Sequence, residues 1–157
     1  DTSFDLDTSA DSDDNFTVTM ATGDDVVNAD EADDVTLDIA GVDSDAVKLE
    51  IEVGGKTITL ENNNGAWEAT GDNASAVNSI TTNDDGIPTA VEIDVTSDGL
   101  NLSDGEIDVD ATVTDDAGNT ATANTNEDIT NEDGDVTQAD TSFDLDTSAD
   151  SDDNFTV

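Results

Sequence analysis

Residues 115–119, Asp-Asp-Ala-Gly-Asn, place two carboxylates and one amide in a short turn. Before the turn, Ile107, Val109, Ala111 and Val113 alternate with polar residues, the period-two pattern of a strand with one solvated face. The small and β-branched residues after the turn resume this pattern, which predicts a β-hairpin. Carboxylate and amide oxygens beside a rigid strand are the ligands that a hard cation such as Ca²⁺ prefers. We therefore expect calcium at this turn.

The chain is extremely acidic. Its 157 residues include 42 Asp and Glu but only two Lys, which gives a formal net charge of -40. Such a charge repels nucleic acid and anionic membrane surfaces, so neither is expected as a partner. Val, Ile, Leu and Phe make up only about a fifth of the chain, close to the level at which acidic sequences stay disordered. Strand-like alternation favours a folded domain, but one that needs help in neutralising its own charge.

Whole classes of chemistry are excluded by composition. The chain has no Cys and no His, which removes thiol chemistry, Ser-His relays, zinc and haem sites, and disulfides. No apolar run approaches the length of a membrane-spanning helix. Paired carboxylates could serve glycoside hydrolysis, but an aromatic content of 3% leaves little to line a sugar cleft. We expect no enzymatic activity.

A long repeat connects the two ends of the sequence. Residues 1–18 recur without change at 140–157, an offset of 139 residues. Recurrence of a segment this long is the mark of a tandem array, in which each unit stacks on its neighbours. We expect a fragment that spans one repeat and the start of the next, while a duplication introduced by cloning is the alternative.

Hydrophobic alternation predicts an all-β fold. Short apolar-polar alternations, broken by turn residues, predict strands near residues 16–20, 35–39, 47–53, 58–60, 91–95, 107–113 and 143–145, with a further strand opening at Trp67. Gly54-Gly55 is expected to form a two-residue hairpin turn. Residues 70–88 lack clear periodicity and are expected to form an excursion loop. About seven short strands joined by turns indicate an antiparallel, immunoglobulin-like β-sandwich with acidic loop insertions.

Five blocks of sequence resemble the bacterial immunoglobulin-like repeats of giant type I-secreted RTX adhesins. They are Gly-Ala-Trp at 65–67, Leu-Ser-Asp-Gly at 102–105, Val-Thr-Asp-Asp-Ala-Gly-Asn-Thr at 113–120, the acidic loop at 24–32 and the junction-like segment at 145–150. The resemblance implies an extender: a repeat that holds a distal ligand-binding region away from the cell surface. It also implies that calcium at the junctions between repeats stiffens the resulting rod.

The resemblance suggests how the chain divides. Residues 1–6 would be the tail of the preceding repeat, 7–146 the extender domain, and 147–157 the junction and the start of the next repeat. Relative to the family pattern, insertions are expected near 70–98 and 124–139. The partners would be neighbouring identical repeats of the same chain, in a monomeric protein at the extracellular cell surface, with roles in cell adhesion and biofilms.

The same resemblance orders the acidic residues along the domain. In an immunoglobulin-type sandwich, the turn at 115–116 lies at the N-terminal end beside the entering segment 7–13, whereas the loop 24–34 and the turn at Asp104 meet the outgoing junction. Ten residues are expected to supply calcium ligands: Asp7, Asp24, Asp25, Asn28, Glu31, Asp104, Asp115, Asp116, Asp144 and Asp146.

Two other functions fit the same composition. A surface domain of a halophile would carry this acidity for solubility, without specific calcium sites. A carbohydrate-binding module would use Trp67 to stack on a sugar, although a lone Trp in a strand more often packs in the core.

Overall fold

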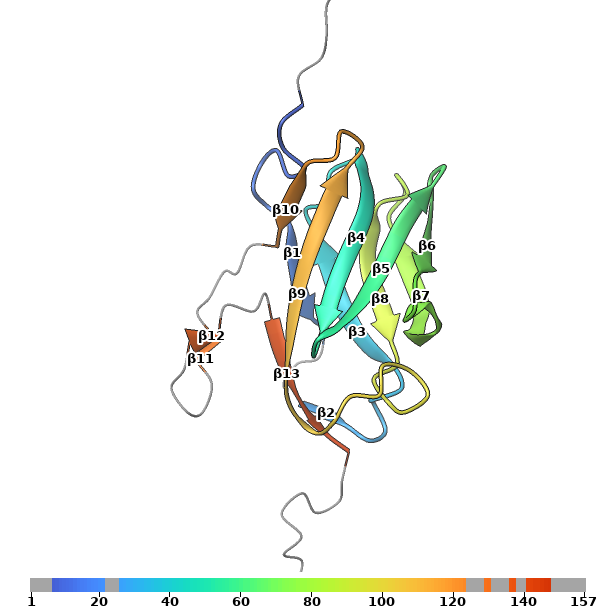
Figure 1. Ribbon diagram of the computed structural model, residues 1–157, viewed down its shortest axis with the longest axis vertical. Helices are drawn as coiled ribbons and strands as arrows, with labels where there is room; N and C mark the ends of the chain where they lie inside the picture. Colours follow the sequence, from blue (N-terminus) through green and yellow to red (C-terminus); the bar gives the residue numbers. More distant parts are fainter. Residues whose placement is uncertain (1–6, 22–25, 124–128, 131–135, 138–140, 148–157) are drawn as a thin grey trace, which may run out of the picture.

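Two packed β-sheets make up the fold (Figure 1). The computed structural model describes residues 7–21, 26–123, 129–130, 136–137 and 141–147. The smaller sheet has the strand order β1 (Thr17–Met20), β3 (Val35–Ala40), β8 (Pro88–Ile93) and β7 (Val77–Thr82). The larger sheet has the order β2 (Val26–Asn28), β13 (Thr141–Asp146), β9 (Gly105–Asp115), β4 (Ala46–Val53), β5 (Lys56–Asn63) and β6 (Ala66–Thr70), and β10 (Thr120–Thr122) pairs with β9. A short 3₁₀ helix, η1 (Ala74–Ala76), and a separate pair, β11 (Ile129–Thr130) and β12 (Val136–Thr137), complete the elements.

The strand order is that of a variable-type immunoglobulin sandwich. The smaller sheet joins β1, β3, β8 and β7 in the order A-B-E-D. In the larger sheet β13, β9 and β4 take the order G-F-C, and β5 and β6 at one edge correspond to the two strands that the variable type adds. Neighbouring strands run antiparallel except β2 and β13, which pair in parallel. The expected all-β sandwich is confirmed, and the described residues contain more strands than the roughly seven predicted. Within the described residues, no helix has the length and apolar character that crossing a membrane requires.

Alternation along β9 builds the centre of the core. Ile107, Val109, Ala111 and Val113 are all buried, and the residues between them face outward or lie at intermediate depth. Phe16 and Phe143, from segments at opposite ends of the chain, are among the largest side chains that are fully buried. The core therefore depends on both ends of the domain being in place.

The region expected as an excursion loop contributes one strand, β7, to the smaller sheet. Residues 77–82 form β7, so the predicted loop at 70–88 is wrong over this stretch, whereas β8, at 88–93, overlaps the strand predicted near 91–95. β7 lies at the edge of its sheet, and none of its residues is fully buried. An edge strand with polar residues on both faces carries little periodicity, which is why its sequence does not resemble a strand.

The last strand of the larger sheet is formed in two pieces. Thr122 of β10 lies opposite Thr112 of β9, and Thr141 of β13 lies opposite Val109. If β10 continued without interruption, residue 125, three residues after Thr122, would pair with Val109, three residues before Thr112. Thr141 takes that position instead. The insertion expected at 124–139 falls between these two pieces and lies almost entirely outside the described residues.

Candidate metal centre

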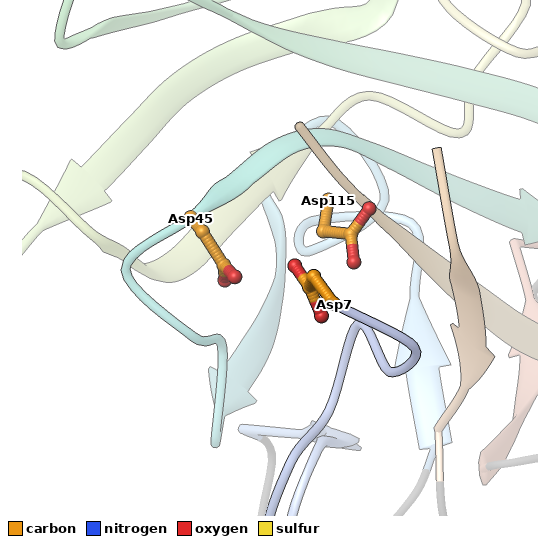
Figure 2. A group of neighbouring side chains, drawn as sticks. All are labelled: Asp7, Asp45 and Asp115. Atoms are coloured by element: carbon orange, nitrogen blue, oxygen red, sulfur yellow. The ribbon is translucent and has the colours of Figure 1, made fainter. Parts of the chain in front are cut away.

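Three segments meet at the N-terminal end of the sandwich: residues 7–15, the loop 43–45 before β4, and the turn 115–119 between β9 and β10. Figure 2 shows Asp7, Asp45 and Asp115 pointing toward one another from these three segments. One carboxylate oxygen of each lies within 4.8 Å of the others. We refer to these three residues as the junction triad. Such a spacing suits oxygens that share one cation.

Asp115 occupies a core-facing position. It continues the inward series of β9 by two residues beyond Val113, and it is only 1% exposed. Asn119 donates its backbone N–H to Oδ1 of Asp115 at 2.7 Å and its side-chain amide to Oδ2 at 2.6 Å. Burial alone raises the pKa of this carboxyl group, but the hydrogen bonds from Asn119 and the backbone outweigh it and hold the pKa below its ordinary value. The residue is thus kept in its anionic form.

Asp45 supplies the observation that most favours a cation. Its backbone carbonyl accepts a hydrogen bond from the N–H of Asp116 at 3.0 Å, which ties the loop before β4 to the turn after β9. Its side-chain oxygen Oδ1 is buried and has no hydrogen-bond partner among the described residues. A buried carboxylate oxygen without a donor is costly unless a cation or water satisfies it. The donor set of the junction triad, three carboxylates with one unsatisfied oxygen, fits Ca²⁺.

A second acidic group lies nearby, formed by Asp11, Asp13 and Asp43. Its carboxylates already accept hydrogen bonds: Asp11 from the N–H groups of Asn15 and Phe16, and Asp43 from the N–H and hydroxyl of Ser12. Desolvation and the neighbouring charges of Asp43 and Asp11 raise the pKa of Asp13. These hydrogen bonds already explain why the carboxylates of Asp11 and Asp43 are held in place. This group therefore makes a weaker case for a bound ion than the junction triad.

The C-terminal end of the sandwich holds another set of predicted ligands. Asn28, which ends β2, accepts a hydrogen bond from the N–H of Asp30, and Glu31 accepts one from the N–H of Asn28. Both side chains therefore shape a turn. Asp144 and Asp146 are exposed on β13, and Asp146 lies opposite Asn28 in the parallel pairing. Among the described residues, no three carboxylates gather at this end.

The predicted ligands that the structure describes are thus dispersed over both ends of the domain. Asp7 and Asp115 come together in the junction triad, and Asp116 lies exposed beside it. Asp104 accepts hydrogen bonds from Thr147 at the opposite end. Asp24 and Asp25 lie outside the described residues.

Sequence reasoning missed Asp45. A usable signal exists in Asp43-Ser44-Asp45, which directly precedes β4, the strand that pairs with β9. Ala46 lies opposite Asp115 in this pairing, so the residue before it must lie beside the hairpin turn. The register of two neighbouring strands, rather than composition, identifies the third member of the triad.

Trp67 gives no support to a sugar-binding cleft. It is only partly exposed and packs against the hydrophobic core, as expected for a lone Trp in a strand. An aromatic ring used to stack on a sugar has to present its face to solvent.

Comparisons with known proteins add one structural likeness. No family model matches the sequence, and no curated protein matches it. One solved structure is similar, from work on the host cell surface retention of a 1.5-MDa bacterial ice-binding adhesin. The likeness covers 86% of this chain at 21% sequence identity with a TM-score of 0.36, and this chain spans 33% of that one. At this level of similarity, it carries no argument about function.

Proposed function

We propose that this domain is a structural extender repeat of a bacterial cell-surface adhesin, made rigid by calcium and joined in tandem to identical copies. The observation that carries the proposal is the junction triad, in which Asp45 has a buried oxygen without a hydrogen-bond partner among the described residues. One of its members, Asp7, lies in the segment that recurs at the end of the sequence.

Electrostatics supports calcium as the ion. Three carboxylates held together repel one another, and the net charge of -40 adds to this cost. A bound divalent cation removes the local repulsion and satisfies the buried oxygen of Asp45. Calcium accepts six to eight oxygens in flexible geometry, so backbone carbonyls and water can complete the shell, whereas Mg²⁺ requires a more rigid arrangement.

The repeat turns the triad into a junction between domains. With an offset of 139 residues, Asp146 is the copy of Asp7. Asp146 is the last residue of β13, so the ligand that enters the triad of one repeat belongs to the final strand of the repeat before it. An ion bound there joins two domains and restricts the hinge between them.

Calcium concentration would decide where the rod forms. At millimolar extracellular calcium, sites with dissociation constants on the order of 10⁻⁴ M are mostly filled. At the far lower calcium level inside the cell, the domain lacks this stabilisation, and the less stable chain is competent for type I secretion. Outside, the filled array projects a distal ligand-binding region of an RTX adhesin, in the setting of cell adhesion and biofilms.

Small-angle scattering on an array of four repeats tests this function. We expect the maximum dimension to be longer, and the profile more rod-like, in calcium than in chelator at matched ionic strength. An array with Asp45→Asn in every repeat is expected to stay flexible in calcium. A maximum dimension that is the same in calcium and chelator would refute the extender function and favour an acidic halophile domain without specific calcium sites.

A further inference from the structure

The last strand of the domain is held on both sides up to its end. β13 pairs with β9 as far as Leu145, which lies opposite Gly105, and with β2 as far as Asp146, which lies opposite Asn28. Figure 1 shows β2 and the end of β13 at the end of the sandwich away from the β9–β10 turn. The direction in which the chain leaves the domain is therefore set by the sheet through residue 146.

Asp104 extends this control by one residue. It immediately precedes Gly105, and its Oδ1 accepts two hydrogen bonds from Thr147, from the hydroxyl at 2.6 Å and from the backbone N–H at 3.2 Å. A carboxylate that accepts two donors from one residue fixes both the backbone and the side chain of that residue. Thr147 is the first residue beyond β13.

We propose that Asp104 is a positioning residue for the next copy of the domain: it anchors Thr147 so that each repeat leaves its predecessor in one direction. The inference rests on the proposed function, because it takes the partner to be a second copy of this chain. It differs from a metal-ligand role for Asp104, since the carboxylate acts here by accepting hydrogen bonds from Thr147.

The 139-residue offset shows why these bonds matter at a junction. Asp146 and Thr147 are the copies of Asp7 and Thr8. Asp146 enters the junction triad of the following repeat, and Thr147 is held by Asp104 of its own repeat. The two attachments are on consecutive residues, whose side chains point to opposite sides of an extended chain. No residue is left between them to act as a hinge.

Distance measurements between spin labels in a chain of two tandem repeats test this anchor. The chain has no Cys, so Ser75→Cys in each repeat, at an exposed position, provides the only two labelling sites. We expect Asp104→Ala in the first repeat, or Thr147→Val at the junction, to broaden the distance distribution about twofold by freeing the linker. Thr147→Ser retains the hydroxyl donor and is expected to retain the narrow distribution.

Asp108→Ala is the matched control, because it removes the same charge from an exposed position on β9. We expect it to leave the distribution unchanged, and we expect Asp104→Ala to leave the melting temperature of the single 157-residue chain unchanged. Unaltered widths in Asp104→Ala and Thr147→Val, or equal broadening by Asp108→Ala, would overturn the anchor. So would a large loss of melting temperature in the single chain, because that indicates a role in folding.

Each variant is compared with its parent both in calcium and in chelator. This separates the two proposals. If calcium does not narrow the distance distribution of the parent, the proposal of an ion shared between repeats is refuted. The effect of Asp104→Ala, measured separately in calcium and in chelator, still decides whether the anchor exists.

Discussion

Replacing Asp45 by Asn tests the junction triad at its most informative position. The substitution keeps the shape of the side chain but removes one of three negative charges, at the residue whose Oδ1 is buried without a partner among the described residues. Ligand charge sets calcium affinity, and losing even an outer-shell partner of a metal ligand typically weakens binding about 10–100-fold. We expect a weakening near the upper end of that range.

The size of the effect follows from linkage. At a calcium concentration about 100 times the dissociation constant, the ion stabilises the parent by about 2.7 kcal/mol. A roughly 100-fold weaker site at the same concentration contributes only about 0.4 kcal/mol. For a domain of this size the calcium-induced rise in melting temperature falls from about 10 °C to about 2 °C. In chelator the variant is at least as stable as the parent, because one source of repulsion is gone.

Thermal melts followed by circular dichroism, with calcium and with chelator at equal ionic strength, measure both effects. Asp108→Asn, which makes the same change of charge on the exposed face of β9, is expected to keep the full calcium-induced rise. The reasoning is refuted if Asp45→Asn keeps the full rise as well, or if Asp108→Asn loses as much of it. Calcium titration by calorimetry on both variants provides an independent measure of affinity.

Two further predictions concern the loops at the same end. The pKa of Asp13 is raised in the folded state, so the charge of Asp13 opposes folding at neutral pH. The folded protein is more stable when Asp13 is protonated, and this stability is lost as pH rises through the folded pKa. Asp13→Asn should therefore raise the melting temperature in chelator at pH 7 but not at pH 3; the same gain at both pH values would contradict this. Gly41 has a φ of +72°, and a Cβ there would collide with the backbone carbonyl of Asn15. Gly41→Ala should lower the free energy of unfolding, measured in urea, by about 3 kcal/mol. Gly65→Ala is the control, because φ there is +90° but the space is open, and it should lower the free energy of unfolding by about 1 kcal/mol. Equal losses in the two variants would show that the collision at Gly41 is relieved.

Much of the fold was predictable because many of its strands have one solvent-exposed face and one buried face. β9 is the clearest example, since its buried and exposed residues alternate over most of its length. Gly54 and Gly55, both with positive φ, form the predicted turn between β4 and β5. β7 was not predictable in this way, because an edge strand without a fully buried residue has no hydrophobic period to detect.

The junction triad was predictable only in part. Asp7 and Asp115 could be placed at one end of an immunoglobulin-type sandwich, but the contribution of Asp45 depends on the pairing of β4 with β9. The burial of Asp115 had a signal in the sequence, because it falls on the same side of the strand as Val109 and Val113. The missing oxygen partner of Asp45 depends on three-dimensional packing, which no spacing in the sequence reveals.

The division of the last strand into β10 and β13 separates the length of the chain from the length of the sandwich. Thr122 and Thr141 each keep their own partner on β9, so the number of residues between them does not enter the register of either piece. Loop closure is also tolerant, since each doubling of such a segment costs only about 0.6 kcal/mol. Copies of the domain could therefore differ in this segment through insertion or deletion while the distance from one junction to the next stays constant.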